Sequence, residues 1–405
     1  MIDKYCNVSS NCCGCGACIA ACPASAIQLK ENKEGFYCAV IDTARCIHCD
    51  VCHRLCPSNS QKQPPSELKG RHLKLFAAKH NDNHIRLRSS SGGVFYALAT
   101  RFIQKGGIVF GATWDAEARC VSHIAVDNVA SLHKLQGSKY TQSYIGDTLG
   151  RVKQLLQQGR DVLFVGTPCQ NAGLRAVLPQ KLQLHLTQVD VICHGVSSPG
   201  LLKRLLNETY PQTPSLSVAF RDKQDGWRRF ALTVSATKEN RLLSRRVLKD
   251  SPFLLGFLNN LTLSRACAGC HSEWKLRSDL TLGDYWNISA VDPAFSDDIG
   301  VSAVIASTQR GLTLLYEIKD LIQLRETSLI AFFQSNRNII FPSVKHPRRK
   351  SFFHAYCHGK GEVCSLLQKY APWTYLAMLS WKIKRHFQKK CARAIAQSID
   401  TESLP

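Results

Sequence analysis

The chain has no apolar run long enough to cross a membrane. Its most apolar stretch, 94–114, is interrupted by Arg101, Gln104 and Lys105, whereas a spanning helix needs about 18 or more apolar residues in a row. Acidic residues are also scarce, because 30 Asp and Glu stand against 52 Lys and Arg, a formal net charge of +22. With 44% hydrophobic and 20% charged residues over 405 positions, the composition predicts two or three folded domains and excludes a disordered or collagen-like chain.

The first residues also lack the pattern of a signal peptide. Met1-Ile2-Asp3-Lys4-Tyr5 leads directly into polar, cysteine-rich sequence. We therefore expect a cytoplasmic protein, in which disulfides are rare. More than half of the 19 cysteines lie within the first 56 residues. Thiols clustered in this way in a reducing compartment indicate metal or redox chemistry.

Composition divides the chain into three expected domains. Residues 1–62 are rich in Cys, Gly and Ala and nearly neutral, and a short Pro-Pro linker follows them. Residues 67–340 carry alternating helix and strand signals. Residues 341–405 form a basic extension that we expect to be helical, since from residue 340 onward there are 12 Lys and Arg against three acidic residues.

The middle domain predicts an α/β fold with a largely parallel sheet and right-handed crossovers. Apolar strands and amphipathic helices alternate in the order 108–112 (strand), 147–158 (helix), 162–165 (strand), 170–178 (helix), 189–192 (strand) and from Ser198 (helix). Further strands are expected at 230–235, 280–282 and 301–306. The first domain predicts an α+β, ferredoxin-like fold.

Two cysteine runs in the first domain have the same spacing, C-x2-C-x2-C-x3-C-P. This is the run of bacterial two-cluster ferredoxins, in which three close cysteines hold one [4Fe–4S] cluster and the fourth ligates the other cluster. The spacing therefore predicts one cluster on Cys12, Cys15, Cys18 and Cys56. It predicts a second cluster on Cys46, Cys49, Cys52 and Cys22.

A pair of zinc knuckles is the alternative interpretation, because CxxC alone also suits zinc. Zinc sites use four ligands each and do not require the x3-C-P ending twice, so the clusters are favoured. Cys6, Cys13 and Cys38 do not fit this scheme, and the simplest interpretation of them is small core thiols.

A third set of cysteines follows the strands of the middle domain. Cys169 and Cys193 come at the carboxyl ends of two predicted parallel strands, where ligands bind in α/β folds. The CxxC pair Cys267 and Cys270 precedes a strand that would bring Asp284 to the same edge. These four cysteines predict one more metal site, with buried core thiols or a redox CxxC as the alternatives.

Two glycine-containing segments suit an anion without requiring one. Ser89-Ser90-Ser91-Gly92-Gly93 precedes an amphipathic helix, and free amides at such a start suit a cofactor phosphate; a plain helix cap is equally compatible. Gly137-Ser138-Lys139-Tyr140 places a lysine in a glycine turn.

Taken together, these segments resemble one family, the coenzyme F-420 hydrogenase/dehydrogenase beta subunits with their ferredoxin-fused relatives. The resemblance runs from the cysteine-rich domain to about residue 310. Its segments occur in order: SSSGG at 89–93, GSKY at 137–140, GTPCQ at 166–170, CHG at 193–195, RDK at 221–223, CAGC at 267–270 and DLTLGDYW at 279–286.

The resemblance implies a flavin, normally FAD, beside a third [4Fe–4S] cluster on Cys169, Cys193, Cys267 and Cys270. It implies flavin contacts at Ser91, Gly92, Gly93, Lys139, Thr167, Pro168, Gln170 and Asp284. A flavin exchanges electron pairs with a substrate and single electrons with clusters, so the implied protein is an iron–sulfur flavoprotein oxidoreductase. Catalytic residues and the substrate are not determined by the sequence.

Several partners fit this interpretation. The family includes deazaflavin-oxidising subunits and ferredoxin-fed reductases, and similar chains occur beside polysaccharide-synthesis enzymes. A basic body suits an acidic substrate or carrier, such as a ferredoxin or the deazaflavin. An electron-transfer subunit without its own substrate site is the alternative. A nucleic-acid-binding iron–sulfur protein is less favoured, because no recognition motif is present.

The tail is predicted to form a helix over 373–397, with aromatic residues leading into lysines and arginines; a second basic run lies at 345–350. This pattern suits the anionic inner face of a membrane. A terminal helix docked on the body is the alternative.

Overall fold

In the computed structural model, the described residues are 8–9, 11–59, 73–270, 274–372 and the separate positions 386, 387, 390, 391 and 394. Most of the predicted 373–397 helix, and Cys6, lie outside them. Among the described residues, no helix is long and apolar enough to span a bilayer.

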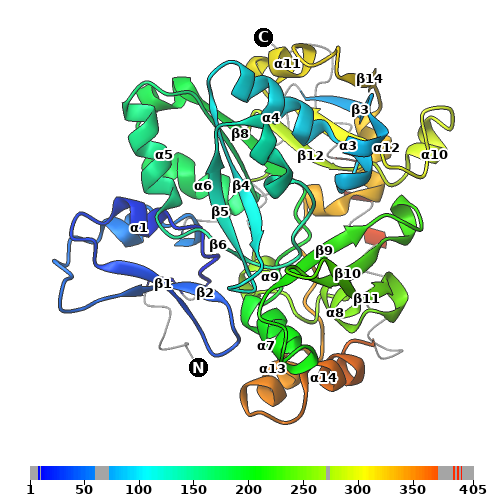
Figure 1. Cartoon of the computed structure of the whole chain (residues 1–405). Helices are drawn as coiled ribbons and strands as arrows, with labels where there is room; N and C mark the ends of the chain where they lie inside the picture. The colour runs from blue at the N-terminus through cyan, green and yellow to red at the C-terminus, as the bar shows by residue number, and fades with distance from the viewer. Residues whose placement is uncertain are drawn as a thin grey trace.

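A nine-stranded sheet forms the centre of the molecule (Figure 1). Its strand order is β14-β3-β13-β12-β8-β7-β4-β5-β6. The bounds are β3 Lys74–His80, β4 Ile108–Asp115, β5 Cys120–Val126, β6 Ser143–Tyr144, β7 Val162–Gly166, β8 Leu186–Val191, β12 Leu280–Asp284, β13 Ser302–Ala306 and β14 Ile322–Glu326.

The sheet is mixed rather than largely parallel. The four central strands β12, β8, β7 and β4 run parallel to one another. β13, β3 and β14 on one side and β5 on the other pair antiparallel. The predicted parallel pairing therefore holds for the strands joined by α5 (Thr148–Gln157) and α6 (Pro168–Val177), and not for the strands toward the sheet edges.

Helices cover both faces of this sheet. Val94, Leu98 and Leu312 from α4 (Val94–Gln104) and α11 (Gln309–Tyr316) pack into the core on one face. Leu149 and Leu174 from α5 and α6 pack into the core on the other. The remaining helices over and beside the sheet are α3 (Asn83–Arg88), α10 (Ile288–Val291) and α12 (Leu329–Ser335).

A second module lies below the large sheet in Figure 1. Its antiparallel strands β9 (Leu216–Asp222), β10 (Ala231–Ala236) and β11 (Arg241–Val247) form a separate sheet, so the strand expected at 230–235 does not join the large one. Their apolar faces share a core with the surrounding helices. Those helices are α7 (Pro199–Thr209), α8 (Pro252–Leu258), α13 (Arg349–Cys357) and α14 (Val363–Tyr370), with the short α9 (Arg265–Ala268) close by in sequence.

The cysteine-rich segment packs against α5 and α6. It consists of α1 (Ala17–Ala21), the antiparallel strands β1 (Ile27–Glu31) and β2 (Tyr37–Ile41), and α2 (Val51–Arg54). Gly14 and Gly16 adopt left-handed backbone, with φ of 70° and 80°. At both positions a side chain would collide with the 142–146 loop, so glycine allows the close approach of the two segments.

The basic run at 345–350 is partly internal. Arg349 is 4% exposed and His346 is 1% exposed. Arg349 forms an ion pair with the buried Glu34 of the β1–β2 turn, at 2.6 Å. This part of the basic charge is therefore not available to a membrane surface.

Candidate functional site

The carboxyl ends of the parallel strands bring the third set of cysteines together. β7 and β8 are neighbours in register, so the loops after them, which carry Cys169 and Cys193, leave the same edge of the sheet. Cys169 lies in the first turn of α6, which begins at Pro168 behind the Thr167 cap. The Gln170 side chain accepts a hydrogen bond from the Thr167 amide at 2.9 Å, which completes a capping box.

The four thiols of this set interact with one another. Burial, with the nearby Cys270 thiol, raises the pKa of Cys193 to about 11. Burial and the charge on Cys193 and Cys270 also raise the pKa of Cys267. A hydrogen bond with Cys13 and burial raise the pKa of Cys169. Because iron binds thiolates, these protons must leave when a metal centre is assembled here.

The ferredoxin-type cysteines lie close enough to interact electrostatically. Burial raises the pKa of Cys18, with further contributions from Cys12 and Cys56 of the same predicted cluster and from Cys52 of the other. Burial likewise raises the pKa of Cys52, with Cys22 and Cys46 as neighbours. Among the described residues, no group of three His, Cys, Asp or Glu can hold a single metal ion. In a cubane each cysteine binds a different iron, so its four sulfurs lie farther apart. The ligand roles stay predictions.

One cavity of about 750 Å³ connects nearly all the segments that the sequence singled out. This volume is within the range of small-molecule and cofactor sites. Seven of the eight predicted flavin contacts line it: Ser91, Gly93, Lys139, Thr167, Pro168, Gln170 and Asp284. All four cysteines of the third set line it as well.

Gly92 lies behind the wall of the cavity. Its amide donates to Ser302 Oγ at 2.9 Å, and a side chain at this position would collide with the Ala78 carbonyl and the Ser302 amide. Its role is therefore to let the turn lie against β3 and β13. The prediction that Gly92 contacts the flavin stays untested, and its neighbours Ser91 and Gly93 face the cavity instead.

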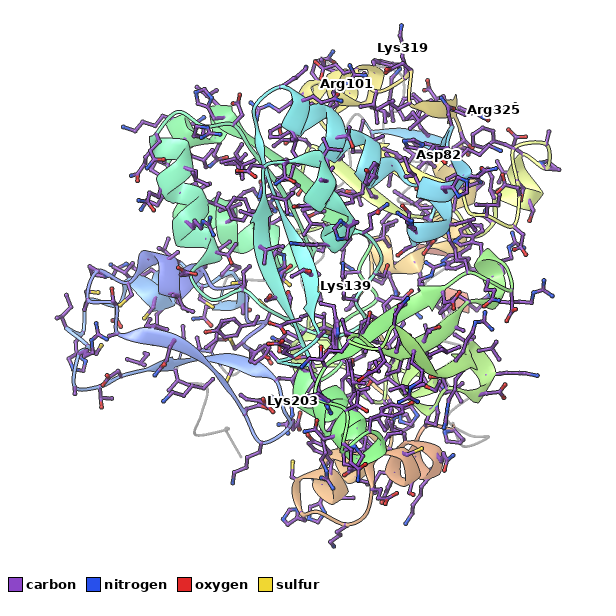
Figure 2. The ribbon with its side chains drawn as sticks, in the orientation of Figure 1. Asp82, Arg101, Lys139, Lys203, Lys319 and Arg325 are labelled. Atoms are coloured by element: carbon purple, nitrogen blue, oxygen red, sulfur yellow. The ribbon has the colours of Figure 1, made fainter. Side chains whose placement is uncertain are left out.

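Lys139 lies at the end of a short turn whose carbonyl groups hold its side chain. Its Nζ donates to the carbonyl oxygens of Leu135 at 3.1 Å and Gln136 at 2.9 Å. Burial lowers the pKa of Lys139 to about 7. Figure 2 shows Lys139 near the middle of the view, between the large sheet and the second module. An anionic ligand in the cavity would favour its charged form.

The Asp284 carboxylate already binds two side chains of the protein. It accepts hydrogen bonds from Arg221 Nη1 at 2.6 Å and Trp227 Nε1 at 3.0 Å. The Arg221 guanidinium in turn lies over the rings of Phe230 and Trp286. Asp284 therefore joins the RDK segment of the second module to the cavity edge.

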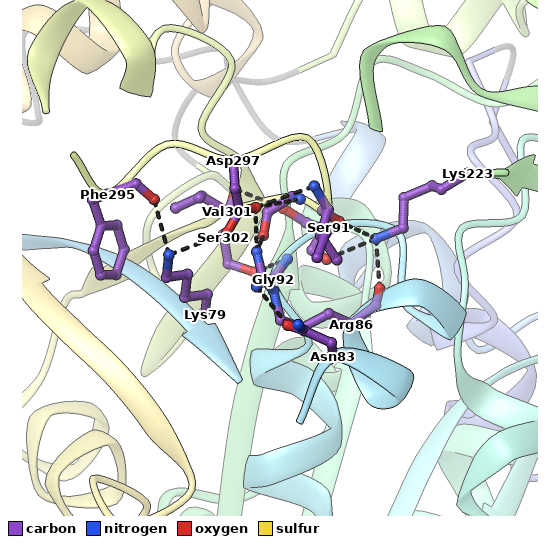
Figure 3. A network of polar contacts seen from close by, with 12 residues as sticks. Lys79, Asn83, Arg86, Ser91, Gly92, Lys223, Phe295, Asp297, Val301 and Ser302 are labelled. Carbon is purple, nitrogen blue, oxygen red and sulfur yellow. Dashed lines mark hydrogen bonds and ion pairs between the residues drawn. The ribbon is translucent and has the colours of Figure 1, made fainter. Parts of the chain in front are cut away.

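A buried lysine ties the serine-rich turn to the second module (Figure 3). Lys223 Nζ donates to the carbonyl oxygens of Arg86, of Ser91 at 3.1 Å and of Ile299 at 2.7 Å. Burial lowers the pKa of Lys223 to about 7. Arg86 also forms an ion pair with Asp297, which forms a second ion pair with Lys79 at 3.1 Å. This network fixes the wall that carries Ser91.

Lys223→Met is expected to lower the free energy of unfolding by about 1–3 kcal/mol, because buried carbonyl groups lose their donor. It is also expected to weaken retention of the flavin that the sequence resemblance implies, since the Ser91 turn loses its anchor. Urea unfolding and the flavin-to-protein absorbance ratio after gel filtration measure the two effects. Lys319→Met, at an exposed lysine, is the control. Flavin retention equal in both variants would contradict the anchoring role.

Sequence reasoning missed three groups near the site. Cys13, assigned to the core, lines the cavity beside the third cysteine set. Lys275, 5% exposed, interacts electrostatically with the thiols of that set and donates to the Asn338 carbonyl at 2.6 Å. The Arg86–Asp297 pair spans 211 residues. The only available signal was the failure of Cys13 to fit the cluster spacing.

Comparisons with known proteins match two regions of the chain. Residues 159–330 match the family described as the C terminus of the coenzyme F420 hydrogenase/dehydrogenase beta subunit, and residues 11–60 match the 4Fe-4S dicluster domain. The F subunit of the F(420)H(2) dehydrogenase from Methanosarcina mazei is 26% identical over 195 residues. That alignment covers 45% of this chain and 53% of the relative, so the chain matches about half of the relative's length.

Two other proteins are similar over different shares of the chain. An uncharacterized protein in the rpl9-rpl11 intergenic region of Porphyra purpurea is 36% identical over 67 residues, 15% of this chain and 85% of that protein. A chain of the F420-reducing [NiFe] hydrogenase complex from Methanosarcina barkeri, solved as a xenon derivative, has a TM-score of 0.44 and 15% identity. The match covers 66% of this chain and 85% of that one.

The sequence matches define a protein with a 4Fe-4S dicluster domain that is related to subunits of coenzyme F-420 hydrogenases and dehydrogenases. Residues 159–330 match the C-terminal region of the coenzyme F-420 hydrogenase/dehydrogenase beta subunits, and residues 11–60 match a 4Fe-4S dicluster domain that precedes it in the same chain.

Proposed function

We propose that the chain is an iron–sulfur flavoprotein that transfers electrons between a one-electron carrier and a two-electron substrate. The single observation that carries the proposal is the shared cavity of about 750 Å³. The third cysteine set forms one part of its wall, and the serine-rich turn, Lys139 and the Thr167–Gln170 loop form another. A flavin held there would lie beside a cluster, which its one-electron chemistry requires.

The residues on the cavity wall fit an anionic, aromatic cofactor. Lys139 supplies a cation beside the Gly137 turn, and Ser90 Oγ accepts a hydrogen bond from the Ser138 amide at 2.5 Å, which joins the two predicted phosphate-binding turns. FAD supplies two-electron exchange with the substrate when it is bound. The chain's residues would hold its phosphates near Ser91 and Lys139 and keep water from its ring in the apolar part of the cavity.

The carrier and the substrate are proposed from the family. A ferredoxin-type protein would exchange electrons with the two N-terminal clusters, and coenzyme F-420 or another acidic small molecule would react at the flavin. The relative from M. mazei is named as one subunit of an F(420)H(2) dehydrogenase, so partner subunits are part of the proposal for this chain.

The test uses the anaerobically purified protein. Reduced ferredoxin is expected to bleach the flavin absorbance near its oxidised maximum, and oxidised coenzyme F-420 is expected to restore it if the deazaflavin is the substrate. Reoxidation of the flavin by a different acidic acceptor would identify another substrate for the same type of reaction. Failure of ferredoxin and of reduced coenzyme F-420 alike to change the flavin would contradict the proposed function.

A further inference from the structure

Lys275 is the more deeply buried of the two lysines found among the described residues that line the large cavity; the other is Lys139. Lys275 lies shortly before β12 and is 5% exposed. Its Nζ donates to the carbonyl oxygens of Asn338 at 2.6 Å and Phe341 at 2.9 Å. Because an ammonium group has three N–H donors, one donor is left for a group inside the cavity.

The Lys275 ammonium forms no ion pair with a carboxylate in the described part of the chain. Lys223 differs in this respect, although carbonyl groups hold it in the same way. Asp284 and Asp297 lie close enough to Lys223 to favour its charged form, and Lys223 does not line the cavity. A buried cation without an anionic partner is costly. We therefore expect the partner of Lys275 to be a group that the cavity receives.

The wall of the cavity carries an excess of positive charge. Among the described lining residues, Asp284 is the only acidic side chain, whereas Lys139, Lys275 and Arg337 are basic. Two side chains of the protein already bind the Asp284 carboxylate. A site with this balance favours an anionic ligand and disfavours a cationic one.

The two lysines lie on different sides of β7. Lys139 donates to the carbonyl oxygen of Leu135, whose side chain lies against β4. Lys275 donates to the carbonyl oxygen of Asn338, and Asn338 Nδ2 lies 2.8 Å from His194 Nδ1 in the loop after β8. β4 and β8 flank β7 in the sheet, and neighbouring strands are about 4.8 Å apart. A phosphate held at Lys139 is therefore not the partner of Lys275.

The cavity extends beyond the predicted cofactor contacts on the side of Lys275. Phe257, Asn338 and Ser343 line it there, and none of them is a predicted ligand of the flavin or of a cluster. All three contact His194: the Phe257 ring lies edge-on at 5.1 Å, Asn338 contacts Nδ1, and Ser343 donates to the carbonyl oxygen. Amide, hydroxyl and aromatic groups beside a cation suit a polar small molecule that carries an acidic group.

We propose that Lys275 binds a carboxylate or phosphate group of a small-molecule substrate in the large cavity, at a position separate from Lys139. This inference rests on the proposed function, because it takes the bound acid to be the substrate. The ammonium group supplies a charge-assisted hydrogen bond to the oxyanion, and no covalent bond forms or breaks at Lys275. The third cluster is a second source of negative charge, since Cys193 and Cys270 interact with Lys275. The test separates these two sources.

The test measures anion binding to the full-length, flavin- and cluster-loaded protein by isothermal titration calorimetry. Inorganic phosphate and citrate are the probes, so that the two kinds of oxyanion are compared. The wild-type protein is expected to bind at least one of them saturably. Lys275→Met is expected to raise that dissociation constant by at least about tenfold, the effect of losing one hydrogen bond to a charged group. Lys275→Arg keeps the charge and is expected to recover most of the affinity.

Lys319→Met is the control, because it removes the same charge at an exposed lysine. Its anion affinity is expected to equal that of the wild type. The absence of saturable binding in the wild type, or equal affinity in Lys275→Met and Lys319→Met, would overturn the inference. Loss of about four iron atoms in Lys275→Met with unchanged anion binding would assign its charge to the third cluster, and would overturn the inference too.

The flavin and iron contents of the same preparations distinguish this failure from failure of the proposed function. Wild-type protein that retains flavin and all its iron but binds neither probe would contradict the role of Lys275 alone. Wild-type protein without flavin would contradict the proposed function itself.

Discussion

Replacing Cys169 with serine is expected to remove about four iron atoms per chain, the content of one [4Fe–4S] cluster. The residue lies in the first turn of α6, among the thiols of Cys193, Cys267 and Cys270. With one corner unligated, the third centre should not assemble, while the two N-terminal clusters keep their ligands. Reduction of the flavin by ferredoxin should then fall by at least about tenfold, the lower end of what metal-site changes cost.

Iron and sulfide analysis, electron paramagnetic resonance and stopped-flow reduction measure this effect. The control is Cys364→Ser, which changes a half-buried thiol in α14 outside every predicted cluster set. Wild-type iron content in Cys169→Ser would show that this cysteine is not a ligand. Loss of about eight or more iron atoms would show that the substitution disrupts more than one centre, which would contradict a role of Cys169 confined to the third cluster.

Glu34→Ala is expected to destabilise the protein by about 3–5 kcal/mol, the effect of leaving a buried charge without its partner. Glu34 and Arg349 are 6% and 4% exposed and pair at 2.6 Å across 315 residues of sequence. Arg265, just before the CxxC pair, also binds the carboxylate. The pair holds the β1–β2 turn against α13, so the variant should also shed the N-terminal segment more easily during limited proteolysis.

Urea unfolding of the cluster-loaded protein measures the destabilisation. Glu117→Ala, at an exposed glutamate, is the control and is expected to change stability by no more than about 0.5 kcal/mol. Equal unfolding midpoints in the two variants would show that the Glu34–Arg349 pair does not secure the N-terminal segment.

The same ion pair gives an expected pH dependence. Burial raises the pKa of Glu34, but hydrogen bonds and charge from Arg349 and Arg265 outweigh it and hold the pKa below its ordinary value of 4.5. The folded state therefore binds this proton more weakly than the unfolded chain. Its contribution to stability is present above pH 4.5 and lost as the pH falls through the lowered pKa. Glu34→Gln should lack this acid-dependent part.

Most residues of the candidate site could be predicted from two sequence features, the cysteine spacing and the ends of the parallel strands. Cys169 and Cys193 could be placed at one sheet edge because β7 and β8 are short apolar runs joined by a helix. The antiparallel edge strands could not be placed in this way. β3 and β13 are as apolar as the central strands, and an apolar run does not indicate whether the neighbouring strand is parallel or antiparallel to it.

Contacts between distant segments were beyond sequence reasoning for a different reason. Lys223 and Glu34 are ordinary charged residues by their local sequence, and the sequence predicted for Asp284 a flavin contact but no ion pair. Each of the three has a partner far away in the chain. Gly92 is predicted to contact the flavin because its motif contains it, and that contact stays a prediction; the structure adds that its lack of a side chain allows the close approach to Ser302.

The most direct test of the proposed function is the iron, sulfide and flavin content of the anaerobically purified wild-type chain. Three [4Fe–4S] clusters and one flavin predict about 12 iron atoms, about 12 sulfides and about one flavin per chain. About eight iron atoms and no flavin would leave only the ferredoxin-type clusters. The large cavity would then belong to a partner-binding scaffold, and the assignment of Cys169, Cys193, Cys267 and Cys270 to a third cluster would be wrong.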